Sequence, residues 1–278
     1  MNEVACTTPL ASFEAKWAAV HPEFGLALKF VAEDRRHAQS AFACLVYELE
    51  HTAFAIREAE PAMIKLQWWA EEFARIGSGA ARHPLTQALA EYPAFATLPA
   101  GCWHEVVVGT MAQRDPEPAA DRDALLQGYA AMYRPLASIE AELFPSTFAE
   151  SVAHARAGAR ALRETASLAN ALRDGRLPLP LDLLARHRLA RGELTRDSPQ
   201  QAAALREWLA ALVSGSAHII GSGAGLGVLT AANASADHWR ARMAARADDP
   251  LAVLNAAFAR VPLRAIWAAW QAGRRSRR

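Results

Sequence analysis

The chain has 278 residues, of which 52% are hydrophobic and 21% are charged. This is the composition of an ordinary globular protein, which excludes the disordered, fibrous and disulfide-rich secreted classes. The formal net charge of +1 gives no reason to expect a nucleic-acid partner.

Helical periodicity dominates the chain. Apolar residues recur at three- and four-residue spacing, which favours amphipathic helices, whereas alternating strand-like runs are nearly absent. The segments with this spacing are Phe24–Ile56, Pro61–Ile76, Ala100–Met111, Leu125–Leu143, Ser151–Leu172, Gln201–Ile220 and Leu251–Trp270. Glycine- and proline-rich breakers separate them. We predict one all-α domain of about ten helices over residues 21–272, preceded by an N-terminal extension (1–20) and followed by a frayed basic tail (273–278).

Two helix starts and one break are specified by local chemistry. Asp197-Ser198-Pro199 and Asp248-Asp249-Pro250 each place capping residues before a proline, the pattern of a first helical turn. The charge-free stretch Trp208–Ala236 is interrupted by the glycine-rich run 221–227, so we predict two buried helices with closely packed backbone at the break rather than a membrane span.

Cysteine use and the chain start bear on location. The three cysteines are few, scattered and odd in number, so they form no zinc or disulfide pattern and favour a reducing compartment. No secretory signal is visible at the start, and we expect a cytoplasmic protein. The arginine-rich tail predicts either a solvated terminus or a peripheral contact with anionic membrane lipid.

Four strings carry the strongest functional signal. They read LVYELEH at 45–51, LQWW at 66–69, NALRD at 170–174 and LPLDLLARH at 179–187. Each string alone is weak, but in this order and spacing the chain resembles the squalene/phytoene synthase family over most of its length. The resemblance implies an isoprenoid-synthase-like helical bundle around a central apolar cavity. In active members, two prenyl diphosphates are joined there head to head, with Mg²⁺ held by carboxylates on facing helices.

The resemblance also assigns residues. It implies that Glu50 and Asp174 are remnants of the two acidic clusters, and that they would be catalytic and would hold Mg²⁺ if the protein is active. The positions that match substrate-binding residues of the family are Arg36, Glu48, His51, Tyr129, Asn170, Arg173 and Arg176.

Both clusters depart from the family pattern. At the first, Glu50-His51 stands where the family has paired aspartates, and Glu48 lies two positions away and so on a different helical face. At the second, the residues after Asp174 are deleted and Gly175-Arg176 follows at once. Among the 29 acidic residues no pair is three apart, and the two pairs that are four apart lie in loop-like segments. The spacing therefore predicts no helix with carboxylates one turn apart, as a Mg²⁺ cluster needs.

Three hypotheses follow. The first is a non-catalytic protein that binds an isoprenoid-like lipid or a protein partner, similar to the branch of the family that includes a mitochondrial complex I assembly factor. The second is an active prenyltransferase that condenses prenyl diphosphates head to head with fewer Mg²⁺ ions, arginines offsetting the missing charge. The third is a transferase or lyase that acts on one prenyl diphosphate.

Simpler structural interpretations accompany these assignments. Trp68 and Trp69 are expected in the core or a cavity wall, and Glu71-Glu72 with Arg75 on a solvated face. Arg173 and Asp174 are expected to form an ion pair that closes a helix. For Arg36 and His51, an exposed helix residue is the alternative to a ligand-binding one.

Overall fold

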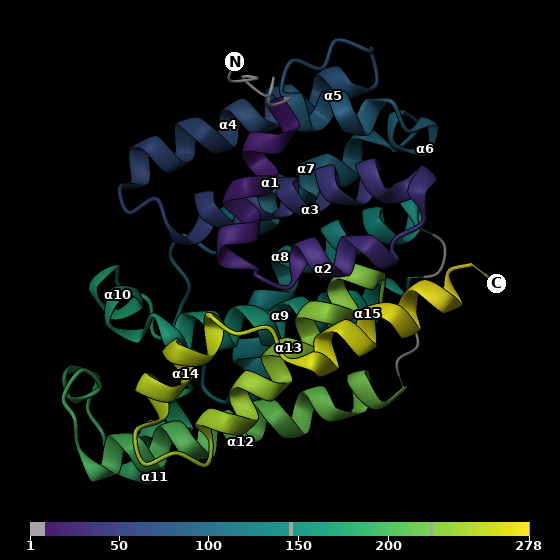
Figure 1. Cartoon of the computed structure of the whole chain (residues 1–278). Coiled ribbons are helices and arrows are strands. Elements are labelled where there is room, and N and C mark those ends of the chain that lie inside the picture. The colour runs from purple at the N-terminus through teal and green to yellow at the C-terminus, as the bar shows by residue number, and fades with distance from the viewer. Residues whose placement is uncertain (1–8, 145–146, 223–224, 278) are drawn as a thin grey trace, which may run out of the picture.

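The computed structural model describes residues 9–144, 147–222 and 225–277, which contain fifteen α-helices, two short 3-10 helices and no strand (Figure 1). The all-α prediction is confirmed. The helices are α1 Pro9–Val20, α2 Phe24–Ala27, η1 Leu28–Phe30, α3 Glu33–Phe54, α4 Ala59–Ile76, α5 Pro84–Ala90, α6 Pro93–Ala96, α7 Ala100–Met111, α8 Arg122–Leu143, α9 Ala149–Ala166, α10 Leu168–Arg173, α11 Leu181–His187, η2 Arg191–Glu193, α12 Pro199–Ser222, α13 Val228–Ala244, α14 Pro250–Phe258 and α15 Leu263–Arg275.

The expected number of helices was too low because apolar periodicity continues across breaks in the backbone. Val31 (ψ 137°) and Ala32 (ψ 142°) are extended and separate α2 and η1 from α3. Ser167 (φ −98°, ψ 27°) separates α9 from α10 in the same way. The tail also begins later than predicted, because α15 continues to Arg275.

Both predicted helix starts are confirmed. The Ser198 Oγ accepts a hydrogen bond of 3.1 Å from the Gln201 N–H, and α12 begins at Pro199. The Asp249 carboxylate accepts one of 3.0 Å from the Ala252 N–H at the start of α14. These bonds satisfy amide groups that the helix itself leaves without acceptors.

The helices form two packed groups around α8 and α9 (Figure 1). In one group α3 packs against α1, α5 and α7, and α7 packs against α4 and α8. In the other, α13 packs against α9, α12, α14 and α15. The described part of the N-terminal extension belongs to the bundle, because Trp17 of α1 is buried. Residues from the functional strings of α3 and α10 line one cavity together with residues of α9.

The glycine-rich break between α12 and α13 packs closely, as predicted. Gly225 has a φ of +77°, its carbonyl accepts a 2.7 Å hydrogen bond from the Phe148 N–H, and a Cβ there would overlap the Phe148 ring. The predicted burial holds for α13 but is wrong for the second half of α12, where residues 213–221 are half-buried or exposed. No described helix alone is long and apolar enough to cross a membrane, although α14 and α15, bent by 53°, reach that composition together.

Candidate functional site

The C-terminal end of α3 carries the first candidate cluster, and Arg114 fixes its position. The Arg114 guanidinium donates hydrogen bonds to the carbonyl oxygens of Ala53 (3.1 Å) and Arg57 (3.1 Å), and also to that of Ile56. Helix C-termini leave such carbonyls without partners, and a cation there also complements the helix dipole. The last turn of α3 is therefore held by a side chain that is remote in sequence.

Glu50 of α3 is engaged with a buried tyrosine. The Tyr133 hydroxyl of α8 donates a hydrogen bond of 2.7 Å to the Glu50 carboxylate. Burial, and then the negative charge of Glu50, raises the pKa of Tyr133 well above its usual range. Glu48 lies on a different face, as predicted, and pairs with Lys65 of α4 at 3.0 Å.

The second cluster is arranged differently from the prediction. Arg173 donates to the Asn170 side-chain oxygen (3.2 Å) instead of pairing with Asp174. Asp174 lies 3.4 Å from Arg57 and 3.6 Å from Arg176. The expected Arg173–Asp174 pair is therefore wrong, because Asp174 follows the end of α10 and turns back toward the loop after α3.

A buried carboxylate that sequence reasoning missed ties the two clusters together. Glu164 of α9 accepts hydrogen bonds from Arg160 (2.5 Å) and Arg176 (2.9 Å). Arg176 also donates to the carbonyl oxygen of Phe54 at the end of α3 (3.1 Å), and the Arg160 guanidinium lies 4.1 Å from the centre of the Phe54 ring. Burial alone would lower the pKa of Arg160, but the surrounding groups, Glu164 first and then Tyr133 and Glu50, together outweigh burial and raise that pKa.

One feature of the sequence could have indicated this network, namely the spacing of the arginines on α9. Arg156, Arg160 and Arg163 stand at positions i, i+4 and i+7, which places them on one helical face. Arg156 pairs with the buried Glu140 at 2.6 Å. Arg163 donates to the His21 ring at 3.0 Å. Burial, and then the charge of Arg163, lowers the pKa of His21.

Residues of both clusters, together with Glu164, line a cavity of about 410 Å³ between α3, α9 and α10. Six of the nine predicted site residues lie there: Glu50, His51, Asn170, Arg173, Asp174 and Arg176. Five arginines line it against three carboxylates: Arg57, Arg160, Arg163, Arg173 and Arg176 against Glu50, Glu164 and Asp174. We call this cavity the arginine pocket.

The remaining predicted residues lie elsewhere. Arg36 is exposed at the start of α3 and donates to the Val31 carbonyl oxygen (3.3 Å). Tyr129 is buried against Phe54, with ring centres 6.2 Å apart, and burial raises the pKa of its hydroxyl. Neither these two residues nor Glu48 line the arginine pocket. Partial burial, and then nearby Lys65, lowers the pKa of His51.

The α4 residues form a separate structural cluster. Trp69 is buried, as expected, while Trp68 is 38% exposed, and both rings pack against His83. The prediction of a solvated face at Glu72 is wrong. Glu72 is fully buried and accepts hydrogen bonds from the backbone of His83 (2.8 Å) and the Thr86 hydroxyl (2.5 Å), so it anchors the chain entering α5.

The donor set does not fit the Mg²⁺ that the resemblance implies. Mg²⁺ requires several oxygen ligands in near-octahedral order, and the described residues include no group of three or more His, Cys, Asp or Glu side chains that could hold a metal ion. The Glu50 carboxylate is bound by Tyr133, and Asp174 is paired with two arginines. A Mg²⁺ ion in the pocket would also be repelled by its five guanidinium groups.

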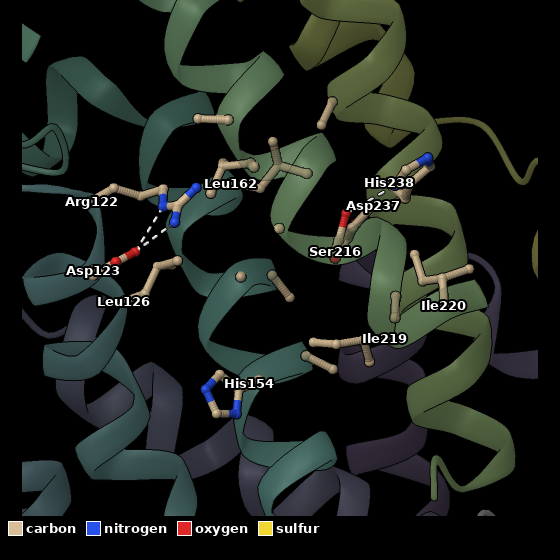
Figure 2. Close-up of a pocket in the computed structure, with 18 residues that line it drawn as sticks. Arg122, Asp123, Leu126, His154, Leu162, Ser216, Ile219, Ile220, Asp237 and His238 are labelled. Carbon is tan, nitrogen blue, oxygen red and sulfur yellow. Dashed lines mark hydrogen bonds and ion pairs between the residues drawn. The ribbon is translucent and has the colours of Figure 1, made fainter. Parts of the chain in front are cut away.

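An apolar hollow of about 220 Å³ lies between α8, α9, α12 and α13 (Figure 2). Leu126, Leu162, Ile219 and Ile220 line it, with His154, Ser216 and His238 among the polar groups around it. The predicted cavity is therefore divided, because the space between α3 and α9 is polar and the apolar space lies beyond α9.

A smaller hollow of about 50 Å³ lies between the two. It shares His21, Tyr47, Glu50, Arg160 and Arg163 with the arginine pocket. It shares Ala155, Ala159 and Ala234 with the apolar hollow. A polar and an apolar site thus adjoin across a wall of small residues.

Fold and site together define an isoprenoid-synthase-type helical bundle whose polar cavity lies where the resemblance places the two acidic motifs. The family model described as squalene/phytoene synthase matches residues 18–267, and the chain belongs to that family. The fold is similar to that of squalene synthase HpnC from Alicyclobacillus acidocaldarius, at 15% identity over 89% of this chain and 93% of that one, with a TM-score of 0.55. A dehydrosqualene synthase crystallised with a ligand is similar at 13% identity, over 90% and 95% of the two chains, with a TM-score of 0.59. Among curated proteins, no match was found.

Proposed function

We propose that this protein binds the anionic head group of an isoprenoid-like lipid, such as a prenyl diphosphate, without a metal ion and without condensing it. The observation that carries the proposal is the arginine pocket itself. The two remnants of the acidic motifs, Glu50 and Asp174, line it together but are bound to a tyrosine and to arginines.

Guanidinium groups suit this role because they present planar, permanently charged donors that match phosphate oxygens. Arg160 lines both the arginine pocket and the small hollow, and its buried Nε has no hydrogen-bond partner among the described residues. Arg173 is exposed at the pocket, where it donates a hydrogen bond to the neutral side-chain amide of Asn170. These groups have donor capacity left for an anion.

The adjoining apolar hollow supports a ligand with a chain. A head group in the arginine pocket would direct its tail past Ala155 and Ala159, whose small side chains separate the pocket region from the apolar hollow. Burial of each CH₂ of such a chain is worth roughly 0.8 kcal/mol. Both parts of an amphiphile therefore have complementary surroundings.

An active prenyltransferase is the second candidate, and one observation favours it. Glu50 and Asp174 line the same cavity, as an enzyme of this family requires. The arginines would then offset part of the charge of a departing diphosphate. A reaction on a single prenyl diphosphate stays a prediction under the same candidate. A role in assembling a larger complex, as in the non-catalytic branch, also stays a prediction.

The binding experiment uses the full chain in EDTA, with farnesyl diphosphate, farnesol and inorganic diphosphate titrated separately by calorimetry. We expect farnesyl diphosphate to bind best, because only it fills both sites. Arg163→Gln should weaken it roughly tenfold or more, the worth of a charged hydrogen bond. The matched control is Arg36→Gln, which removes an exposed arginine outside the pocket. Absence of binding in EDTA would refute the proposal.

The turnover experiment separates the two candidates. The protein is incubated with farnesyl diphosphate and Mg²⁺ or Mn²⁺, and released diphosphate and apolar product are followed together. We expect neither. Metal-dependent turnover that is lost in Glu50→Gln or Asp174→Asn would instead establish the active prenyltransferase and make those carboxylates catalytic.

A further inference from the structure

The C-terminal region has a charge distribution unlike the rest of the chain. Residues 250–278 contain six arginines and no acidic residue, although the whole chain has a net charge of only +1. The remainder of the chain is therefore net negative. Helix α15 lies within this cationic region and ends with Arg274 and Arg275.

Helix α15 buries its small residues and exposes its large ones. Ala265, Ala269, Ala272 and Gly273 form the buried face, and α15 packs on α13, α2 and η1. The approach is close enough that a Cβ at Gly273 would overlap the Phe30 carbonyl oxygen. The opposite side carries a stripe at positions i, i+4, i+7 and i+11, composed of Leu263, Trp267, Trp270 and Arg274.

The stripe is apolar and aromatic at one end and cationic at the other. Leu263 is 83% exposed and Trp267 is 58% exposed, and the rings of Trp267 and Trp270 lie 4.6 Å apart. The Arg274 guanidinium lies 4.9 Å from the centre of the Trp270 ring. Indole rings flanked by arginines are the side chains that favour the boundary between lipid head groups and acyl chains. Arginine can extend its charge to the head groups while its stem stays among apolar atoms.

We propose that the outward stripe of α15 binds the surface of an anionic lipid bilayer, with the helix axis lying in the plane of the membrane. The charge of residues 250–278 is complementary to acidic lipid and argues against a second copy of this chain. A two-fold contact through the same face would place the arginines of both copies against each other. The proposal concerns a surface and does not depend on the content of the arginine pocket.

The test is co-sedimentation of the full chain with vesicles of phosphatidylcholine containing about one third phosphatidylglycerol, with no prenyl compound present. Trp267→Ser removes the most exposed indole of the stripe. Its matched control is Ile64→Ser on α4. Ile64 is also exposed (62%), but it lies far from α15 in the sequence, on a helix that has no excess of positive charge. The charge variant Arg274→Gln/Arg275→Gln is matched by Arg188→Gln/Arg196→Gln, which removes two exposed arginines elsewhere.

We expect the wild-type partition coefficient to fall roughly fivefold for each arginine removed from α15 and at least as much for Trp267→Ser, with both controls unchanged. Added salt should weaken binding in the same direction. Circular dichroism checks that each variant is folded. Failure of the wild type to bind anionic vesicles, equal binding to pure phosphatidylcholine, or equal losses in stripe and control variants would each overturn the proposal. Concentration-dependent dimerisation abolished by Trp267→Ser, without vesicle binding, would assign the face to a second copy instead.

Discussion

Acidification tests the buried ion pair that joins the start of α2 to α13. Glu23 and Arg240 approach to 2.9 Å, and their side chains are 1% and 0% exposed. Burial alone would raise the pKa of Glu23, but hydrogen bonds from His21 and Arg240 outweigh it and lower the pKa from 4.5 to about 2. The pair stabilises the wall that carries His21 into the arginine pocket, so its loss would also affect the site.

The magnitude follows from proton linkage. A folded pKa below the unfolded one means that the stabilisation is fully present above about pH 4.5 and is lost as pH falls toward about 2. A shift of this size corresponds to about 3 kcal/mol in total. About 2 kcal/mol of it should already be lost at pH 3.

The assay is urea unfolding followed by circular dichroism at pH 5 and pH 3, for the wild type and Glu23→Gln. We expect the free energy of unfolding to fall by about 2 kcal/mol more in the wild type, because the variant has no carboxylate to protonate there. Glu91→Gln, which removes an exposed carboxylate, should behave as the wild type. Equal losses in wild type and Glu23→Gln would refute the reasoning.

Three further changes test the local geometry by urea unfolding at neutral pH. Gly225→Ala should lower the free energy of unfolding by about 2 kcal/mol or more, since it adds a Cβ at positive φ against the Phe148 ring. The control Gly215→Ala, in open space within α12, should raise it by about 0.5–1 kcal/mol. Equal effects of the two substitutions would contradict the packing at the break. Arg114→Met should cost about 2 kcal/mol by leaving the carbonyls that end α3 without their donor, and a neutral result would show that water replaces it. Tyr133→Phe should lower the free energy of unfolding by about 1.5–3 kcal/mol, because the Glu50 carboxylate loses a hydrogen bond. An unchanged free energy of unfolding would show instead that Glu50 turns to solvent.

The sequence was sufficient for the fold class and for the neighbourhood of the site. Helical periodicity predicted the main helices, and the family resemblance carried by the four strings implied that Glu50 and Asp174 face one cavity, which both of them line. Their actual partners could not be predicted, because Tyr133 and Arg57 reach them from other elements. Periodicity reports which face of a helix is apolar, but not which charged side chain of another helix meets a carboxylate.

Glu72 and Glu164 show the same limit, because the sequence does not indicate that either carboxylate is buried. Each lies in a charged segment that favours exposure by composition, yet each is buried. Glu72 is satisfied by backbone N–H groups near His83, and Glu164 by Arg160 and Arg176. A buried carboxylate is tolerated only when such donors are in place, and their convergence is a tertiary property. For Glu164, the spacing of the arginines on α9 was a local sign of such donors.

The positions of the pocket arginines determine what their charge can do. Arg160 is held between Glu164 and the Phe54 ring, and Arg176 between Glu164 and the Phe54 carbonyl. Such guanidinium groups are fixed before a ligand arrives, so they favour binding of an anion at little entropic cost. The proposed function therefore predicts that diphosphate binding survives chelation of every metal in solution, because these guanidinium groups and not a metal ion supply the positive charge.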